Sequence, residues 1–495
     1  YYWRVRAVNE TGQGEWSSTW SFTTGEDPFR PFITTWKTDN IGGSDDNQIR
    51  ITMIGPGYDF TIDWGDGTTE EIQANYVQLG GGSIEHTYDE IGIYQVEIKG
   101  VFPRIFLFGG YSADSGKLLS IDQWGDIEWS SMERAFENTP NLVINATDAP
   151  DLTSVTSMKN MFSNALSMNS DLNHWDVSNV ENMEELFFEA ESFNGDITNW
   201  DTGRVTNMTG MFARADDFNQ DISGWNTSNV THMVGMFWEA VSFNQDISGW
   251  NTGSVLTMLN MFNNASSFDQ DIGVWDVSNV LIMSSMFTGA SSFNQNLDNW
   301  DTGNVTDMAS MFNQAINFDQ NLGDWVVTSV EDMNFMLSNS GLSVENYDNT
   351  LIGWESQDVQ ENVVLAANGL EYCAATEARE NLITTYSWFI KFDSQTADCE
   401  VNTTPPSVVT LSTPQDGASG IPINPQLVWE AATDAGTYQV QVSTEEGLTN
   451  PVIDQSGIAE TQLLVENLNY ETLYYWRVRA VNEAGQGEWA APWSF

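Results

Sequence analysis

The chain has 495 residues, enough for three or four ordinary domains, and carries 70 Asp and Glu against 16 Lys and Arg, a formal net charge of −54. This charge argues against a nucleic-acid binder, because neutralising phosphates requires Lys and Arg, and it disfavours an anionic membrane surface for the same reason. No apolar run approaches the roughly 18 residues of a transmembrane helix, and 21 Trp with 12% aromatic residues indicate a well-packed protein rather than a disordered acidic tail.

The two ends of the chain repeat each other. Residues 1–22 and 474–495 are offset by 473 positions and differ only at the pairs Thr11/Ala484, Ser17/Ala490, Ser18/Ala491 and Thr19/Pro492. We therefore expect the segment to span about one period of a longer tandem array, with residues 1–24 forming the terminal hairpin of a preceding domain. Two strands alone are marginal in water, so this hairpin needs further strands or a neighbouring chain.

Residues 33–103 are predicted to form a β-sandwich, with strands at Ile51–Met53, Tyr58–Trp64, Ile91–Ile98 and Phe102–Phe108. The segments Asp63-Trp64-Gly65-Asp66-Gly67-Thr68, His86-Thr87-Tyr88 and Gly92-Ile93-Tyr94-Gln95-Val96 resemble a PKD-type domain. Asp63 and Asp66 offer hard carboxylate oxygens suited to Ca²⁺. The alternative, which we favour, is a hairpin turn capped by these side chains.

The middle of the chain has a repeat of 25 residues. A fixed period in this range is typical of a solenoid, in which stacked turns share one core. Val and Phe columns follow the same period, and degenerate turns precede them. The two clearest columns are Trp at positions 175, 200, 225, 250, 275, 300 and 325, and Met at positions 183, 208, 233, 258, 283, 308 and 333.

One turn, residues 218–240, predicts the local structure of the rest. Ile222, Trp225 and Thr227 fit a short strand, and an apolar stripe at helical spacing begins after Asn229. We therefore expect a leucine-rich-repeat-like α/β solenoid over residues 104–354, including an N-terminal lead-in. The rival role for the Trp column is stacking on a cofactor or a sugar, but its equivalence in every turn favours a buried core.

The repeat region also resembles a known family. Residues Lys117–Asp126 lead into Trp129–Met132 and Ala135-Phe136, and turns of the form N-x-D-I-x-x-W-D/N-T/V-S/G-N-V-x-x-M-x-x-M-F follow. This pattern resembles the BspA-like surface-protein repeat, once catalogued as a mycoplasma lipoprotein repeat of unknown function. The resemblance covers about 33–400. It implies an extracellular bacterial surface protein, since several members of the family are adhesins, but it identifies no ligand.

An acidic column recurs once per turn. Adjacent carboxylates near 5 Å apart would repel by ~0.8 kcal/mol in water, and Ca²⁺ between them would relieve this repulsion. The same column becomes Asn296 and Asn321, which keep the carbonyl acceptor and drop the charge. Acceptance of backbone hydrogen bonds is therefore the favoured reading, with Ca²⁺ as the alternative, for Asp171, Asp196, Asp221, Asp246 and Asp271.

The periodicity stops after Trp354, and residues 355–403 are predicted to cap the open end of the solenoid. Ala374–Ile383 can form a helix and Trp388–Phe392 a strand. Cys373 and Cys399 are the chain's two cysteines. They indicate a disulfide formed in an oxidising compartment, worth ~3 kcal/mol on the chain-entropy model, and a metal pair fits less well because no His is near.

Residues 404–495 show short alternating strands separated by turns, which suits a β-sandwich. The run Leu468-Asn469-Tyr470-Glu471-Thr472-Leu473-Tyr474, followed by WRVRAVN and a turn at Gly485 and Gly487, resembles a fibronectin type III domain. In that family Leu468 and Tyr474 would form the corner before the sixth strand, and Trp429 would match a core Trp. No Arg-Gly-Asp triplet is present, so integrin-type recognition is not implied.

The sequence nominates no catalytic machinery. His86, His174 and His232 belong to no metal-ligand spacing, and no phosphate loop or nucleophile motif occurs. We therefore expect a non-catalytic extracellular stalk or filament, structural or adhesive, without cofactors except Ca²⁺ as an option. Its partners would be copies of itself, in tandem and as parallel chains, and an unknown surface ligand. The alternatives are a glycan- or protein-binding module and, more weakly, the ancillary region of a secreted enzyme.

Overall fold

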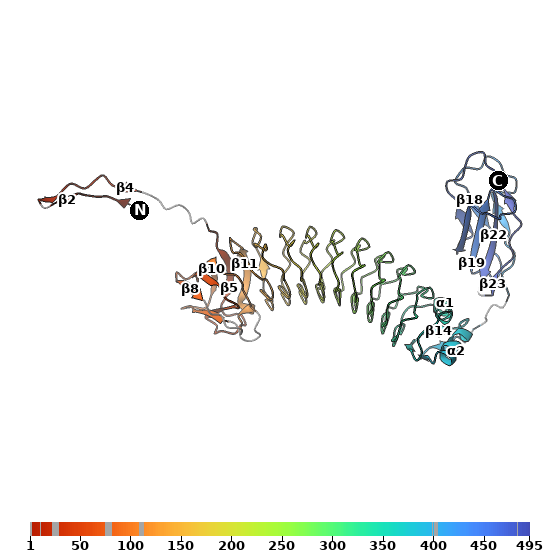
Figure 1. The fold of residues 1–495 in the computed structure, drawn as a ribbon, viewed down its shortest axis with the longest axis horizontal. Helices are drawn as coiled ribbons and strands as arrows, with labels where there is room; N and C mark the ends of the chain where they lie inside the picture. The colour runs from red at the N-terminus through yellow and green to blue at the C-terminus, as the bar shows by residue number, and fades with distance from the viewer. Residues whose placement is uncertain are drawn as a thin grey trace. The chain divides into compact units, whose positions relative to one another are not determined.

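A computed structural model describes residues 2–9, 11–21, 29–74, 82–107, 113–397, 399, 404–482 and 484–495 (Figure 1). The chain divides into two compact units. Unit 1 is Tyr1–Leu370 with Ala378–Asp393, and unit 2 is Glu371–Glu377 with Ser394–Phe495. Among the described residues, no helix has both the length and the apolar character needed to cross a membrane.

A hairpin precedes the first sandwich. Strand β1 (Tyr2–Trp3) pairs with β4 (Trp20–Ser21), and β2 (Val8–Asn9) pairs with β3 (Gly12–Gln13), both antiparallel. We call residues 2–21 the terminal hairpin. Its apolar side chains are open to solvent, with Val5 59% and Val8 64% exposed. A hairpin was predicted here, and the structure contains it.

The first sandwich is built from β5 (Phe32–Lys37), β6 (Gln48–Met53), β7 (Tyr58–Asp63), β8 (Thr69–Ala74), β9 (Gly82–Thr87) and β10 (Ile93–Val101). One sheet has the order β12-β11-β5-β10-β7-β8, and the other is the pair β6-β9. Side chains alternate between buried and partly buried along β5 and β6, as a sheet with one face on a core requires. Trp36, Trp64 and Phe102 are fully buried in this core.

The predicted strand over Phe102–Phe108 is wrong for the part that the structure describes. Residues 102–107 have no ladder pairing, and Phe108 lies outside the described residues. Pro103 has no N–H to donate, which disfavours a ladder here. Phe102, Ile105 and Leu107 are nevertheless buried, so the segment supplies apolar side chains to the core without joining a sheet.

The sheet of the first sandwich continues into the repeats. After the short 3₁₀ helix η2 (Ser115–Lys117), β11 (Leu118–Gln123) pairs antiparallel with β5, and β12 (Val143–Ile144) pairs parallel with β11. Ile121 O accepts hydrogen bonds from Asn145 and Ala146 N–H at 2.8 and 3.1 Å. The repeats therefore begin on a strand of the sandwich itself.

Residues 126–354, here called the coil, stack turn upon turn; β12 lies near the start of this stretch, and the helix α1 (Val344–Glu355) is its last element (Figure 1). The predicted strand and helix of each turn are both absent: residues 151–343, all of them described, contain turns and isolated bridges only. Parallel bridges join equivalent residues of successive turns, running Ser157–Asn182–Asn207–His232–Thr257–Ile282–Asp307–Asp332.

The backbone of the apolar stripe explains the missing helix. Gly235 and Glu239 have φ of +56° and +58°, the left-handed region, and equivalent positions in other turns do the same. Met236 N–H donates within its turn to Met233 O at 3.3 Å, whereas Gly235 and Phe237 N–H donate to the next turn, at 2.8 and 2.9 Å. An α-helix would send each of these groups along its own axis. The stripe is instead a series of β-turns. Its backbone N–H groups donate alternately within the same turn of the coil and to the next turn.

The Trp, Met and Phe columns form the buried core of the coil. Trp175 to Trp325 are at most 4% exposed, and the Met column is fully buried. The Trp250 and Trp275 rings are stacked with centroids 6.4 Å apart, and the Phe237 and Phe262 rings 5.5 Å apart. The core reading of the Trp column is therefore confirmed over the sugar-stacking alternative, since these rings are covered.

Helix α1 follows the last turn. Ser343 caps it by accepting from Asn346 N–H, and Tyr347, Leu351 and Trp354 face inward. Beyond it, β13 (Val364–Ala366) pairs parallel with β15 (Phe389–Lys391), and α2 (Thr376–Thr385) lies between them in sequence. The predicted helix over Ala374–Ile383 and strand over Trp388–Phe392 correspond to α2 and β15.

Unit 2 contains the short parallel pair β14 (Glu371–Tyr372) and β16 (Ser394–Gln395), and then a two-sheet sandwich. One sheet is β17 (Leu411–Thr413), β18 (Gln426–Trp429) and β21 (Gln462–Leu464). The other has β20 (Ile453–Ile458), β19 (Thr437–Ser443), β22 (Tyr475–Asn482), β23 (Gly485–Gln486) and β24 (Trp493–Ser494). Tyr474 Oη accepts from Asn469 N–H at 3.1 Å, which forms the corner expected before β22.

Candidate functional site

The acidic column of the coil caps its corners. Asp196, Asp221, Asp246 and Asp271 each accept, through Oδ1, the backbone N–H two residues ahead at 2.9–3.0 Å. Asp171 does the same at 2.9 Å, and so do the amide oxygens of Asn296 and Asn321. This shared geometry explains why Asp and Asn interchange in the column, because the corner needs only the carbonyl-type oxygen.

Hydrogen bonding also affects the ionisation of these corners. The Ser223 hydroxyl, and then the Ser223 backbone N–H, lower the pKa of Asp221. Thr198 and Ser248 act in the same way on the pKa of Asp196 and of Asp246. At these three corners the charged form of the carboxyl group is therefore the one that the hydrogen bonds stabilise.

A second column of Asp and Asn side chains, which the sequence did not predict, also caps corners of the coil. Its members accept the N–H two residues ahead at 3.0–3.1 Å, and they are Asp176, Asp201, Asn226, Asn251, Asp276 and Asp301. The signal was the D/N-x-S/G spacing directly after each Trp from Trp175 to Trp300. Each turn thus has two capped corners, five residues apart.

An amide ladder runs along the coil beside these corners. Asn194 Oδ1 accepts Asn219 N–H, and Asn219 Oδ1 accepts Asn244 N–H, both at 2.9 Å. Gln245 Nε2 adds bonds to Asn219 O and Oδ1 at 3.0 and 3.1 Å. These polar side chains satisfy the backbone between turns.

Asp63 and Asp66 lie in one turn of the first sandwich, and each caps it. Asp63 Oδ1 accepts Gly65 N–H, and Asp66 Oδ1 accepts Thr68 N–H, both at 2.9 Å. Asp66 Oδ2 lies 2.8 Å from His86 Nε2. Burial alone would raise the pKa of Asp66, but the bonds from His86 and Thr68 together lower it. The geometry is that of the capped turn, and no cluster of three His, Cys, Asp or Glu suited to a metal occurs within the described residues.

A buried ion pair that the sequence did not predict connects the segment before the coil to the first sandwich. Lys117 and Asp114 side chains are 1% and 0% exposed, with Nζ 3.9 Å from Oδ2. Lys117 Nζ donates to the carbonyl oxygens of Asp45 and Gln48 at 2.8 and 3.0 Å. Asp114 accepts the backbone N–H groups of Gly43 and Arg50 at 2.8 and 2.6 Å. Both charges are thus satisfied, and they join the loop before β6 to η2.

Cys373 and Cys399 form a disulfide, with Cα atoms 5.2 Å apart. The bond lies beside the β14–β16 pair of unit 2, so it closes the segment that contains α2 and β15. Both predicted cysteines are brought together here.

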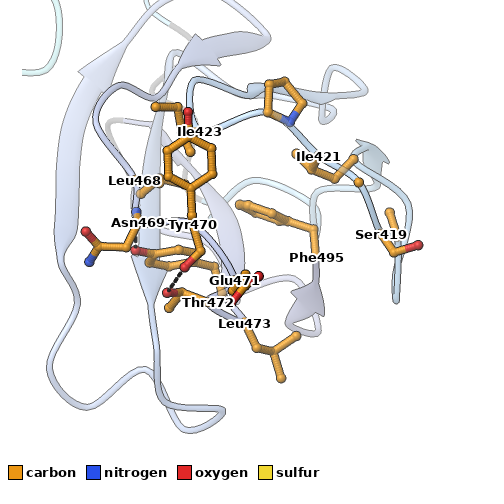
Figure 2. Close-up of a pocket in the computed structure, with 14 residues that line it drawn as sticks. Ser419, Ile421, Ile423, Leu468, Asn469, Tyr470, Glu471, Thr472, Leu473 and Phe495 are labelled. Atoms are coloured by element: carbon orange, nitrogen blue, oxygen red, sulfur yellow. Dashed lines mark hydrogen bonds between the residues drawn. The ribbon is translucent and has the colours of Figure 1, made fainter.

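Two of the hollows in the described part of the chain involve the sandwiches. One, of about 440 Å³, opens at one end of the C-terminal sandwich, where Tyr470, Leu473 and Phe495 surround it (Figure 2). Tyr470 is 80% exposed and accepts from Thr472 Oγ1 at 3.0 Å through its carbonyl. The other, of about 670 Å³, lies where the first sandwich meets the coil, between Arg30, Lys99 and Trp129.

The surface of the coil has one sign of charge over most of its length. No Lys or Arg occurs from Ala215 to Ala378, while Asp and Glu recur in nearly every turn. The last cation before this stretch, Arg214, bridges Glu189 and Glu239 at 2.6 and 2.9 Å. Such a surface attracts cations and basic partners and repels anionic polymers.

These features define a multidomain, mostly β-structured chain with few helices, in which a sandwich, a stack of 25-residue turns and a second sandwich follow one another. Residues 130–249, 193–284 and 270–369 match the family model described as Mycoplasma protein of unknown function, DUF285. Residues 405–495 match the fibronectin type III domain, as their sequence predicted. Searches of curated proteins and of solved structures found no match.

Proposed function

We propose that the chain is a non-catalytic, extracellular structural or adhesive element whose coil is a solenoid of the BspA-like type, preceded by a PKD-type sandwich. Fibronectin type III and DUF285 regions are typical of secreted or surface proteins, which supports this location. The bacterial cell surface remains part of the proposal, as do tandem units of about 473 residues and assembly with other copies.

The observation that carries the proposal is the repeated hydrogen bonding between turns, with several bonds at almost every interface. Met208, Gly210, Phe212 and Arg214 N–H each donate to the next turn. Most equivalent groups do so along the coil up to Asn339, which donates to Asn368 O at 2.7 Å. The indole N–H groups from Trp200 to Trp325 add one bond per turn, as from Trp250 Nε1 to Ile222 O at 3.0 Å. Tension along the coil axis is therefore shared by several bonds at each interface.

The polar columns support a structural role rather than a bound cation. The side-chain Oδ1 atom at each corner already accepts a backbone N–H, and Asn replaces Asp without loss of that bond. We propose that Ca²⁺ is not needed for the fold of the coil. Removal of divalent ions with EDTA should leave the melting temperature of the full chain unchanged, and a large fall would show that the carboxylates hold a cation.

Stretching single full-length chains between terminal handles tests the load-bearing role. Turns that open one at a time should release about 80 Å each, because 25 extended residues span roughly 83–90 Å. The fibronectin type III domain provides an internal reference event. A coil that opens as one featureless event at low force, before that domain, would contradict a load-bearing element.

A binding module is the second candidate, favoured by the hollow beside Tyr470 (Figure 2). A highly exposed aromatic ring next to a concave, partly apolar surface suits stacking on a sugar ring or an apolar side chain. Glycan-array binding by the full chain that is lost in Tyr470→Ala, and kept in the control Val274→Ala on the coil, would favour this function. Equal binding by both variants would exclude the hollow.

A further inference from the structure

One stretch of the coil surface carries exposed aliphatic side chains in three successive turns. Leu256 and Leu281 hold equivalent positions in adjacent turns, where Leu281 N–H donates to Leu256 O at 3.0 Å, and they are 47% and 48% exposed. Partly exposed aliphatic side chains stand within a few positions of them, in the same turns and in the turn before. We call the whole group the aliphatic patch; it consists of Val234, Leu256, Leu259, Leu281 and Ile282.

The turns on either side have threonine where the patch has its two most exposed leucines. Oγ1 of Thr206, Thr231 and Thr306 each donates to a carbonyl of the turn before, at 3.2, 3.2 and 3.3 Å. The column of parallel bridges runs through all of these turns without a break, so they share one backbone arrangement. Leucine cannot make the threonine bond, and it leaves apolar surface in water. The fold therefore does not require the leucines of the patch.

Carboxylates follow the patch along the same column of bridges. Ile282 is bridged to Asp307, and Asp307 to Asp332. Oδ1 of each aspartate accepts the backbone N–H two residues ahead, at 2.9 and 2.8 Å. Asn207, which precedes the patch in the same column, accepts the equivalent N–H at 3.0 Å. A neutral side chain is thus enough to cap this corner, and the fold does not require the two charges either.

The charge around the patch selects the kind of partner. Glu331, which is exposed, adds a third carboxylate beside Asp332, and residues 215–378 contain no Lys or Arg. Carboxylates next to exposed aliphatic groups favour a partner that is both cationic and apolar. An anionic partner is repelled, and this includes a second copy of the chain, whose net charge is −54.

The spacing of the turns suits an α-helix that lies along the stack. Equivalent Phe rings in these turns have centroids 5.5–6.0 Å apart. An α-helix returns side chains to one face every ~5.4 Å, whereas alternate side chains of an extended strand are ~6.7 Å apart. A helix therefore stays in step with successive turns over a longer distance than a strand does.

We propose that the aliphatic patch, together with Asp307, Glu331 and Asp332, binds a basic amphipathic helix of a protein partner. The aliphatic side chains of that helix cover Leu256 and Leu281. Its Lys or Arg side chains, one and two helical turns further on, pair with the carboxylates. The inference goes beyond the proposed function, because an element that only bears load needs no such surface.

The test measures the binding of a fluorescein-labelled peptide to the full chain by fluorescence anisotropy. The probe is an Ala- and Gln-based helical peptide of about 18 residues, with Leu at i and i+4 and Lys at i+7 and i+11, which places all four on one face. A second peptide has Glu in place of both Lys. The Lys peptide should bind, with an affinity that falls as salt is added, and the Glu peptide should not bind.

The first pair of variants tests the aliphatic side chains. Leu256→Thr/Leu281→Thr introduces the residue that the neighbouring turns have, so the coil should keep its melting temperature or gain a little. Binding of the Lys peptide should weaken by about tenfold or more, because its leucines lose their apolar contacts. The matched control is Ile316→Thr, which changes an aliphatic side chain that is 61% exposed elsewhere on the coil, and it should bind as the native chain does.

The second pair of variants tests the carboxylates. Asp307→Asn/Asp332→Asn keeps both caps, as Asn207 does, and should weaken binding and flatten its salt dependence. The matched control is Asp176→Asn/Asp201→Asn, which removes the same charge from the second column of capping side chains and should leave binding unchanged. If Leu256→Thr/Leu281→Thr lowers the melting temperature of the coil, the aspartate pair and its control decide the proposal.

Each outcome supports or overturns the proposal. Weaker binding in both patch variants, with both controls unchanged, supports it. It is overturned if the Lys peptide does not bind the native chain, if the Glu peptide binds equally well, or if a patch variant and its control lose binding to the same extent. Self-association of the native chain that Leu256→Thr/Leu281→Thr abolishes would identify a second copy as the occupant, and overturns it too. None of these results affects the stretching experiment, so the load-bearing role is tested separately.

Discussion

Replacing Trp250 with alanine should destabilise the coil more than any change at its surface. The ring is 4% exposed, it stacks on Trp275, and its N–H donates to Ile222 O at 3.0 Å. Truncating a buried Trp costs about 3–5 kcal/mol, and the buried carbonyl left without its donor adds about 1–3 kcal/mol. We therefore expect a loss of about 4–6 kcal/mol, allowing for incomplete additivity.

Scanning calorimetry of the full chain measures this effect. A region of this size shifts by about 2–4 °C per kcal/mol, so the transition of the coil should fall by roughly 10–20 °C. The transition of the fibronectin type III domain should stay in place as an internal control. Val274→Ala changes a side chain that is 68% exposed in the next turn, directly before Trp275, and should shift nothing. Equal melting temperatures for Trp250→Ala and Val274→Ala would refute the assignment of the Trp column to the core.

Three further predictions test the polar groups. Hydrogen bonds lower the pKa of Asp221, so its contribution to stability is present above pH 4 and fades as the pH falls through the folded-state pKa. Asp221→Ala should therefore cost less than ~1 kcal/mol at pH 7 and progressively less as the pH is lowered below 4, measured by thermal melting. Burial raises the pKa of Glu137 to about 7, so the stability that its protonated form contributes is complete below pH 4.5 and is lost as the pH rises through 7. Glu137→Gln should therefore raise the melting temperature at pH 8 but not at pH 4. Lys117→Met leaves Asp114 buried and unpaired and should cost about 3–5 kcal/mol, measured by chemical unfolding; a near-neutral result would contradict the ion-pair role.

Periodicity predicted the core of the coil because burial acts on side-chain type. Every turn must present one large ring at the same place to its neighbours, so Trp at intervals of 25 marks a covered column. The corner aspartates were predicted as hydrogen-bond acceptors for a related reason. Their replacement by Asn296 and Asn321 showed which property of the side chain the position keeps.

Backbone conformation was harder to predict, since the same apolar spacing suits a helix and a ribbon of turns. Gly235 and Asn260 are weak signs of the left-handed region, but their equivalents Ser285 and Phe335 give no such sign. Tertiary hydrogen bonds between turns outweigh the local preference of these residues. The Lys117–Asp114 pair was missed because its partners are backbone groups near Asp45 and Arg50, about 70 residues earlier in the chain.

The spacing of the stacked rings shows how little length each repeat adds. Equivalent Phe rings lie 5.5–6.1 Å apart, for example 5.5 Å for Phe237–Phe262 and 6.0 Å for Phe243–Phe268. A helix of 25 residues would extend about 37 Å, roughly six times as far. A chain selected for reach alone would therefore use helices. Using 25 residues per turn instead gives the coil a large circumference and a wide, repetitive surface. Exposed positions on that surface, such as Val274 and Ile316, can be substituted without altering the packing of the core.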